Sequence, residues 1–388
     1  KFFAYAIMLV LANDGCADAK GSWKVFPRLF LQFARHGRAL TEVCMSTLEY
    51  ASVDKQIEKL KEQNLIIPNE NSAKKLLTIY GYSNVIKSYR DPYVIAVDNQ
   101  KVFRSDITFD QIFSLYNLDK NLRIAVMASM LDLEEYMKEA TADVIAQSFG
   151  TNQDQYLQFR NYQNKRKYKY RFTLTGILET LRNTLETDKE PIHHYQAKYG
   201  IVPPWILFKS VYFSTIVNFI DQLKASEQIM LVNKIYPHDF FLTEDEQVKL
   251  LMDTLFIALE YRNIAAHGGR IYNYQCNRDL HFAGSESLEK GFSLLIRLLK
   301  LMDYQAPFKY LNKVLNRELT RHCTAFPQDL TYLGQILNVN ITSHQVVWIS
   351  DSSNKYHANQ HCSGLKNAKQ IDLKQAQELG FVQCKRCC

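Results

Sequence analysis

The sequence predicts a mainly α-helical protein that ends in a small α+β module. Three observations lead to this fold class. Apolar residues recur at helical spacing over most of the chain. A length of 388 residues is enough to bury more than one core, and a composition that is 47% hydrophobic excludes a disordered chain. Residues 338–388 differ in character and carry half of the eight cysteines, which predicts a separate module there.

The N-terminal residues allow two interpretations. The apolar run Phe2 to Ala12, followed by the small residues Ala17 and Ala19, has the outline of a secretory signal peptide, although the run is too short to span a bilayer. Alternatively, the natural protein begins at Met45, and residues 1–44 lie outside the functional protein. Because export conflicts with a thiol-rich cluster, we expect a cytoplasmic protein without membrane contact; a genuine signal peptide would make it an exported one.

Apolar spacing and turn residues place the elements of the first half of the chain. We expect a helical pair at Val53 to Leu65 and Ser72 to Leu77. A short hairpin follows between Tyr93 and Phe103, with Asp98 and Asn99 as its turn. One long central helix is expected from Thr108 to Phe149, ended by Gly150.

The second half begins with a polar, basic and aromatic passage between Tyr156 and Phe172. Four helices are expected after it, at Leu174 to Leu185, Ile206 to Leu223, Thr243 to Ala266 and Ser287 to Leu301. In the C-terminal module we expect a strand at Val346 to Ile349 and a short helix at Asp372 to Leu379.

The end of the helix at Thr243 to Ala266 carries the candidate catalytic residues Arg262, Asn263 and His267. Five positions separate Arg262 from His267, so on a regular helix their side chains point about 140° apart. The glycines that follow, at 268 and 269, favour a left-handed helix end, which leaves His267 in the last turn, where the helix dipole favours the imidazolium.

A histidine beside an arginine supplies proton transfer and positive charge for RNA transesterification without a metal. Asn263 would hold the histidine or a phosphate oxygen by a hydrogen bond. In the simpler alternative, Arg262 only caps the helix end and His267 is an ordinary terminal cation.

The basic passage is a candidate RNA-binding segment. Its cations alternate with tyrosines, a composition suited to phosphate contacts and base stacking. The net charge of +7 permits a polyanionic partner without requiring one. A solvated helix face is the alternative. The candidate residues are Lys165, Arg166, Lys167, Tyr168, Lys169 and Arg171.

The C-terminal module contains a candidate metal site. Cys384 and Cys387 have the C-x-x-C spacing that lets two thiolates bind one Zn²⁺, and His357 with Cys362 would complete a tetrahedral set. The spare candidates are His361 and Cys388. We expect structural zinc, with free thiols as the alternative, because a closed four-ligand site stabilises a short segment of this kind.

Taken in order, the sequence features resemble the Abi family of abortive-infection proteins, of the AbiD and AbiF kind, over about Met45 to Leu301. Arg262 to His267 is also similar to the R-[polar]-x-x-x-H motif of HEPN domains. One departure is Lys138, where we expect arginine a turn after Glu134; that glutamate would either orient the catalytic arginine or form an ion pair. The other matching features are Gln56-Ile57, Leu60, Leu65 to Ile67, Phe109-Asp110, Leu115-Tyr116, Asp119 to Arg123, His194, Tyr199-Gly200, Pro203 to Trp205 and Arg270 to Asn273.

The resemblance implies a HEPN-like helical bundle over residues 45–325 that acts in phage defence as a metal-independent endoribonuclease and leaves a cyclic phosphate. HEPN sites are commonly built from two facing motifs, so a single motif implies a homodimer, and an inhibitory RNA or antitoxin is a further possible partner. Two alternatives stay open: a non-catalytic RNA-binding or sensor protein that uses the same basic site, and a motif that serves only as a dimer contact.

Overall fold

The computed structural model describes residues 50–97, 100–339, 346–350, 353–357, 362, 365 and 367–387. The expectations for residues 1–44, for the turn at Asp98 and Asn99, and for His361 and Cys388 concern residues outside these ranges. Within them the protein is mainly helical with a small C-terminal sheet, which confirms the predicted fold class.

The N-terminal elements follow the sequence prediction. The predicted helical pair forms as α3 (Val53–Glu62) and α4 (Glu70–Tyr80), and each helix begins at a capping side chain that accepts a hydrogen bond from a first-turn N–H. A π-helical turn, η1 (Ser83–Lys87), and a 3-10 turn, η2 (Asp91–Tyr93), come next. They lead into the predicted antiparallel hairpin, whose strands are β1 (Val94–Val97) and β2 (Gln100–Phe103).

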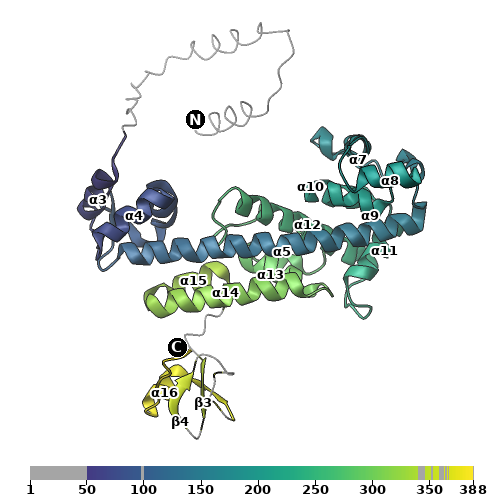
Figure 1. The fold of residues 1–388 in the computed structure, drawn as a ribbon. Helices are drawn as coiled ribbons and strands as arrows, with labels where there is room; N and C mark the ends of the chain where they lie inside the picture. The colour runs from purple at the N-terminus through teal and green to yellow at the C-terminus, as the bar shows by residue number, and fades with distance from the viewer. Residues whose placement is uncertain are drawn as a thin grey trace, which may run out of the picture. The chain divides into compact units, whose positions relative to one another are not determined.

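Helix α5 (Phe109–Phe149) is the central element of the helical body, as predicted. It begins at Thr108, whose hydroxyl accepts a hydrogen bond from Gln111 N, and ends at Gly150, which has a φ of +81°. Its 41 residues span about 60 Å, and helices α9, α11, α12 and α14 pack against it. Figure 1 shows α14 running alongside α5 and the helices α7 to α10 near its C-terminal end.

In the segment after α5, one predicted helix does not form as expected. The single helix expected at Ile206 to Leu223 is wrong, because Val211 and Tyr212 are extended and separate two helical pieces. The break lets Phe208 and Phe213 both be buried, whereas on one continuous helix these side chains, five positions apart, would point about 140° from each other. The elements of this segment are α6 (Gln153–Tyr156), η3 (Phe159–Asn161), η4 (Tyr170–Phe172), α7 (Leu174–Leu185), α8 (Ile192–Tyr199), α9 (Pro204–Leu207), η5 (Phe208–Ser210), α10 (Phe213–Asp221) and α11 (Ala225–Ile235).

The helices of the second half complete the main core. The predicted helix at Thr243 to Ala266 is confirmed as α12 (Glu244–Ala266), capped by the Thr243 hydroxyl. Helix α13 (Phe292–Leu301) begins later than expected, because a 3-10 turn, η6 (Ser285–Ser287), and non-helical residues precede it.

Several elements of the helical body were not predicted from the sequence. Besides α8 and α11, they are α14 (Ala306–Ala325), η7 (Pro327–Asp329) and α15 (Leu330–Leu337). Helix α14 contributes Leu311 and α15 contributes Leu337 to the core that surrounds α5, so this core continues past residue 325.

The C-terminal module has its own small core of Val347, Ile349 and Ala376. The expected strand and helix form as β3 (Val346–Ser350) and α16 (Leu373–Glu378). The sheet has the order β5-β3-β4-β6, in which β6 runs parallel to β4 and the other neighbours are antiparallel. The remaining strands are β4 (Ser353–His357), β5 (Lys369–Asp372) and β6 (Val382–Gln383).

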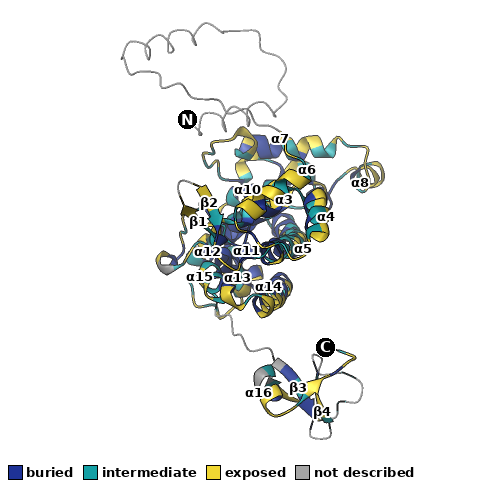
Figure 2. Cartoon of the chain, turned by 90° about the vertical axis from the view of Figure 1, so that its left-hand side faces the viewer, coloured by how far each residue is buried: buried dark blue, intermediate teal, exposed yellow. Residues whose placement is uncertain are grey.

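The burial pattern matches this division into a helical body and a module. Figure 2 shows buried residues on the inner sides of the body helices and exposed residues on their outer sides. Among the described helices, none combines the length and the apolar character that crossing a membrane requires.

Candidate functional site

The C-terminal end of α12 positions the predicted catalytic residues. His267 caps the helix, and Gly268 follows it with a left-handed φ of +73°. Gly268 N donates to Ala265 O at 3.2 Å and Gly269 N donates to Ile264 O at 2.9 Å, which is the hydrogen-bond pattern of a Schellman helix end. A Cβ on Gly269 would lie 2.7 Å from Ile264 Cγ2, so the tight turn depends on both glycines.

Helix α5 anchors the chain that follows this turn. The buried Asp119 carboxylate accepts hydrogen bonds from Ile271 N at 3.0 Å, Tyr272 N at 2.8 Å and the Tyr89 hydroxyl at 2.6 Å. Burial raises the pKa of Asp119, and these hydrogen bonds oppose that effect. One turn further along α5, Arg123 Nη1 donates to Gly268 O at 2.6 Å. The turn that holds His267 is therefore tied to α5 through its glycine and through the residues that follow.

Arg262, Asn263 and His267 line one cavity of about 490 Å³. Residues from the basic passage, from α10 and from the middle of α12 complete its wall. On a regular helix, Arg262 and His267 would point about 140° apart. They share the cavity because His267 is the C-cap, where the regular helical geometry ends. The other lining residues are Lys169, Arg171, Phe172, Tyr212, Phe213, Ser214, Asn218, Phe256 and Leu259.

The cavity has a positive lining. It contains the cations Lys169, Arg171 and Arg262, and none of its described lining residues is an aspartate or glutamate. Arg262 Nη1 donates to Asn263 Oδ1 at 3.3 Å, and within the described residues no carboxylate pairs with this guanidinium. His267 is exposed, and its ring makes no hydrogen bond to the described part of the chain. A phosphate group entering the cavity would therefore meet uncompensated positive charge.

The basic passage has two halves. The anchored half contains Lys165 and Lys167, and the cavity half contains Lys169 and Arg171. Lys165 and Lys167 both pair with Asp221 at the end of α10, the first at 3.1 Å. Burial opposes ionisation of Asp221, but the two ammonium groups outweigh it and lower the pKa of this carboxyl. Lys169 and Arg171 lie at the cavity. The two other candidates of this segment, Arg166 and Tyr168, are exposed.

Gly176 fixes the cavity half of this passage against α7. A Cβ at this position would lie 2.3 Å from Tyr170 O and 3.0 Å from Arg171 Cα, and the first of these distances is one that real side chains do not reach. The Thr173 hydroxyl accepts from Gly176 N at 3.2 Å and donates to Tyr170 O at 2.7 Å. The missing side chain of Gly176 thus allows the backbone next to Arg171 to pack directly on the helix.

Glu134 forms the ion pair that was one of its two predicted alternatives. Its carboxylate lies 2.7 Å from Lys138 Nζ on the next turn of α5. Both residues line a separate cavity of about 620 Å³, together with Glu135, Glu139 and Trp205 among others. This larger cavity carries several carboxylates, so it suits a polyanion less well than the cavity at His267.

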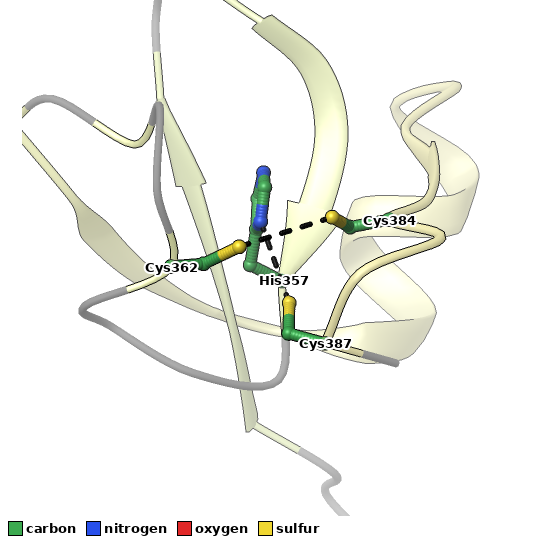
Figure 3. A group of neighbouring side chains, drawn as sticks. All are labelled: His357, Cys362, Cys384 and Cys387. Carbon is green, nitrogen blue, oxygen red and sulfur yellow. Dashed lines mark hydrogen bonds between the residues drawn. The ribbon is translucent and has the colours of Figure 1, made fainter.

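The C-terminal module brings the four predicted metal ligands together. Figure 3 shows His357, Cys362, Cys384 and Cys387 with their side chains pointing toward one another. Their ligand atoms all lie within 4.8 Å of each other; the sulfurs of Cys362 and Cys384 are 4.0 Å apart, and Cys387 Sγ is 3.5 Å from His357 Nδ1. Around one tetrahedral Zn²⁺ these two separations would be about 3.8 Å and about 3.6 Å. The cluster therefore fits a metal ion, although other divalent metals accept the same ligands.

The comparison with known protein families adds a decisive observation. A family model described as Abi-like protein matches residues 75–273, just over half of the chain. The chain belongs to the Abi-like protein family. Membership indicates an abortive-infection type of function. No curated protein and no solved structure matches the chain.

The matched region of this Abi-like protein contains the whole cavity site. It extends from α4 to the residues just after the helix end at His267, and it includes Asp119, Arg123 and the basic passage. The His/Cys cluster lies outside it.

Some cavity residues were missed from the sequence. Asn218 gives a weak local signal, since it is a polar residue between the apolar positions of α10. Tyr212, Phe172 and Phe256 give no such signal, because aromatic residues at helical spacing most often belong to a core.

Proposed function

We propose that this Abi-like protein is an endoribonuclease whose reaction takes place in the cavity at the end of α12. The observation that carries the proposal is that Arg262, Asn263 and His267 share this cavity with Lys169 and Arg171, without an acidic side chain among the described lining residues. RNA offers what such a site needs, namely a phosphate for the cations and bases for the aromatic wall.

The reaction that fits these groups is an internal transesterification. The 2′-oxygen of one nucleotide attacks the adjacent phosphorus, the bond from phosphorus to the 5′-oxygen breaks, and the products carry a 2′,3′-cyclic phosphate and a 5′-hydroxyl. His267 moves a proton at one of the two oxygens, and Arg262 stabilises the additional negative charge on the phosphorane. Asn263 holds the Arg262 guanidinium through the 3.3 Å contact.

A single histidine leaves one proton transfer without a partner. In an in-line displacement the entering and leaving oxygens lie on opposite sides of the phosphorus, so one imidazole does not reach both. Among the described residues that line the cavity there is one histidine, His267, and it is exposed at the helix end. We therefore propose a homodimer in which His267 of a second copy serves the other oxygen. A fully active monomer in sedimentation velocity under assay conditions would contradict the dimer.

The role of His267 is tested by cleavage of total cellular RNA and of defined single strands. His267→Ala should lower the rate at least about 100-fold, the usual contribution of a general acid or base, while RNA affinity changes little. His238→Ala is the matched control, since His238 is also exposed and does not line the cavity. Cleavage by the His267 variant at the native rate would reject the proposal. Tight RNA binding by a native protein that does not cleave would favour the non-catalytic binder.

We further propose that cleavage of cellular RNA stops the growth of an infected cell, and that the protein acts in the cytoplasm. The family indicates the abortive-infection type of function, and RNA is reached most directly in that compartment. Cells that express native protein should stop growing on phage infection, whereas cells that express His267→Ala should continue to support phage growth. Equal phage protection by both proteins would contradict an RNase mechanism.

For the C-terminal module we propose a structural zinc ion held by His357, Cys362, Cys384 and Cys387. The separations between their ligand atoms support this, and a bound ion would join β4 to the chain after β6, where the small core offers few apolar contacts. Metal analysis should find one zinc per chain, and Cys384→Ser with Cys387→Ser should remove it. Absence of zinc from native protein purified without chelator would contradict the site.

A further inference from the structure

We infer that Ser114 is the nucleophile of a catalytic site separate from the cavity at His267, and that small polar carboxylic esters are its substrates. His322 moves the serine proton, and Asp329 positions the histidine. Ser114 belongs to α5, His322 to α14 and Asp329 to η7, and Figure 1 shows α14 alongside α5. The inference is independent of the proposed RNase function, because the described residues that line the two pockets are different.

Two hydrogen bonds join these three side chains in a row. Ser114 Oγ lies 2.8 Å from His322 Nδ1, and His322 Nε2 lies 2.9 Å from Asp329 Oδ2. A carboxylate only accepts hydrogen bonds, so in the neutral imidazole Nε2 carries the hydrogen and Nδ1 offers its lone pair to the Ser114 hydroxyl. A hydroxyl, a base and an orienting carboxylate in this order activate serine nucleophiles, here with the two ring nitrogens exchanged.

The surroundings of Asp329 keep the histidine in this tautomer. Tyr93 and Gln111 also donate to the Asp329 carboxylate, at 2.6 Å and 2.9 Å. Burial raises the pKa of Asp329, but the hydrogen bonds outweigh it and hold the pKa below its usual value, so the group is ionised at neutral pH. Only 1% of His322 is exposed, so packing fixes the ring between its two partners.

Ser114 is the member of the row that a substrate reaches. It is partly exposed and lines a pocket of about 340 Å³, whereas His322 and Asp329 are buried. Asn117 lies one turn after Ser114 on α5, and within the described residues its amide has no hydrogen-bond partner, so it is available to an oxygen on which negative charge develops. The small volume and the polar lining suit a small polar ester. The other lining residues are Asp110, Phe113, Asn121 and Arg321.

The reaction that fits these groups is acyl transfer followed by hydrolysis. Ser114 Oγ bonds to the acyl carbon of the ester while its proton passes to His322 Nδ1. The bond from that carbon to the alcohol oxygen breaks, and the departing oxygen takes the proton from Nδ1. Water then attacks the acyl-serine in the same way, with Nδ1 again accepting and returning a proton, and the carboxylic acid leaves.

Labelling of the full chain with a fluorophosphonate, followed by peptide mass spectrometry, tests the nucleophile. Ser114 should react at least about 100-fold faster than Ser148, because a positioned base contributes roughly 10²–10⁴-fold. Ser148 is the matched control, since it is also a partly buried serine of α5 but its hydroxyl contacts the sulfur of Met230 instead of a base. Native protein should also hydrolyse p-nitrophenyl acetate, and Ser114→Ala should not. Equal labelling of the two serines, or ester hydrolysis that Ser114→Ala retains, would overturn the inference.

A cysteine in place of Ser114 tests the base while the buried His322 stays intact. Iodoacetamide should alkylate Ser114→Cys at pH 7 at least about ten-fold faster than Ser148→Cys, because His322 Nδ1 takes the thiol proton and the thiolate is the reactive form. Peptide mass spectrometry distinguishes these sites from the native cysteines. Equal alkylation of the two introduced cysteines in folded protein would show that the contact between Ser114 and His322 is structural only, and the inference would be wrong.

Discussion

At the scale of single residues, Asp119 links the long helix to the candidate catalytic turn. It lies 152 positions before Ile271 in the sequence, yet its carboxylate binds the N–H groups of Ile271 and Tyr272, which follow the turn. These donors are buried, and without an acceptor each would cost about 1–3 kcal/mol. The carboxylate also lies 3.6 Å from Arg123 Nε, whose guanidinium binds Gly268 O.

Two replacements of Asp119 should distinguish the contribution of its hydrogen bonds from the contribution of its charge. Asp119→Ala leaves both N–H groups unpaired and should lower the free energy of unfolding by about 2 kcal/mol or more, with a marked loss of RNA cleavage. Asp119→Asn should keep most of the stability and most of the RNA cleavage, because the amide still offers an acceptor to the backbone and can donate to Tyr89. Urea unfolding and cleavage rates measure this. Equal loss in Asp119→Ala and in the exposed control Asp132→Ala would contradict the anchoring role.

Gly268 offers a second residue-scale prediction. Its φ of +73° is unfavourable for any residue with a side chain, so Gly268→Ala should cost about 1–2 kcal/mol of stability and reduce cleavage. Gly284 has a similar φ of +80° but precedes η6 and is not part of the turn after His267. Gly284→Ala should therefore lose similar stability while cleavage by the folded protein is unchanged. If both variants keep full activity, the turn does not position His267.

At the scale of elements, the packing of η4 on α7 brings Lys169 and Arg171 to the cavity. Gly176 permits this packing, and the pairs of Asp221 with Lys165 and Lys167 hold the preceding residues to α10. The four paired or cavity-lining cations of the passage therefore differ in their surroundings. Two of them bind a carboxylate of the protein, and two remain available at the site.

Gly176→Ala should displace the segment, although Gly176 is not itself among the residues that line the cavity. A Cβ at 2.3 Å from Tyr170 O forces that backbone away. RNA affinity should therefore fall about ten-fold or more while α12 is intact, because the two cations proposed to contact phosphate move. Thr175→Ala, at the exposed neighbouring position of α7, is the control. Filter binding of single-stranded RNA measures the effect. Unchanged affinity in Gly176→Ala would contradict the role proposed for this packing in RNA binding.

At the scale of the whole molecule, a buried polar cluster joins α5, α14 and η7. Asp329 accepts hydrogen bonds from Tyr93 at 2.6 Å, Gln111 at 2.9 Å and His322 Nε2 at 2.9 Å. Burial raises the pKa of Asp329, but the hydrogen bonds of His322, Tyr93 and Gln111 outweigh it, so that the pKa lies below its usual value.

This lowered pKa predicts how stability depends on pH. The carboxylate stabilises the folded protein fully above the pKa of the unfolded chain, about 3.9, and this contribution is lost as pH falls through the lower pKa of the folded state. The free energy of unfolding of native protein should therefore decrease with falling pH below about pH 4. Asp329→Asn should be less stable at pH 7 and show a smaller decrease. Parallel pH profiles of the two proteins would contradict this role.

The contrast between sequence and structure has a physical cause. Capping residues and apolar spacing are local, so α5 and α12 were predictable, as were the C-x-x-C and histidine positions of the module. The break at Val211 and Tyr212 depends on which neighbours are available to bury the surrounding side chains, which local spacing does not contain. Along the sequence, the basic passage and the motif at His267 are separate features. Only tertiary packing puts Lys169, Arg171 and Asn218 into the same cavity as Arg262.

His267 and Arg262 are proposed to promote attack by the 2′-hydroxyl group of RNA, and the most direct measurement removes that group. It compares a defined RNA with the same strand that carries one 2′-deoxynucleotide at the mapped cleavage site. We predict that native protein cuts the RNA to a 2′,3′-cyclic phosphate and leaves the substituted strand intact at that position. Cleavage of the substituted strand at the same site, or products without a cyclic phosphate, would contradict this central claim.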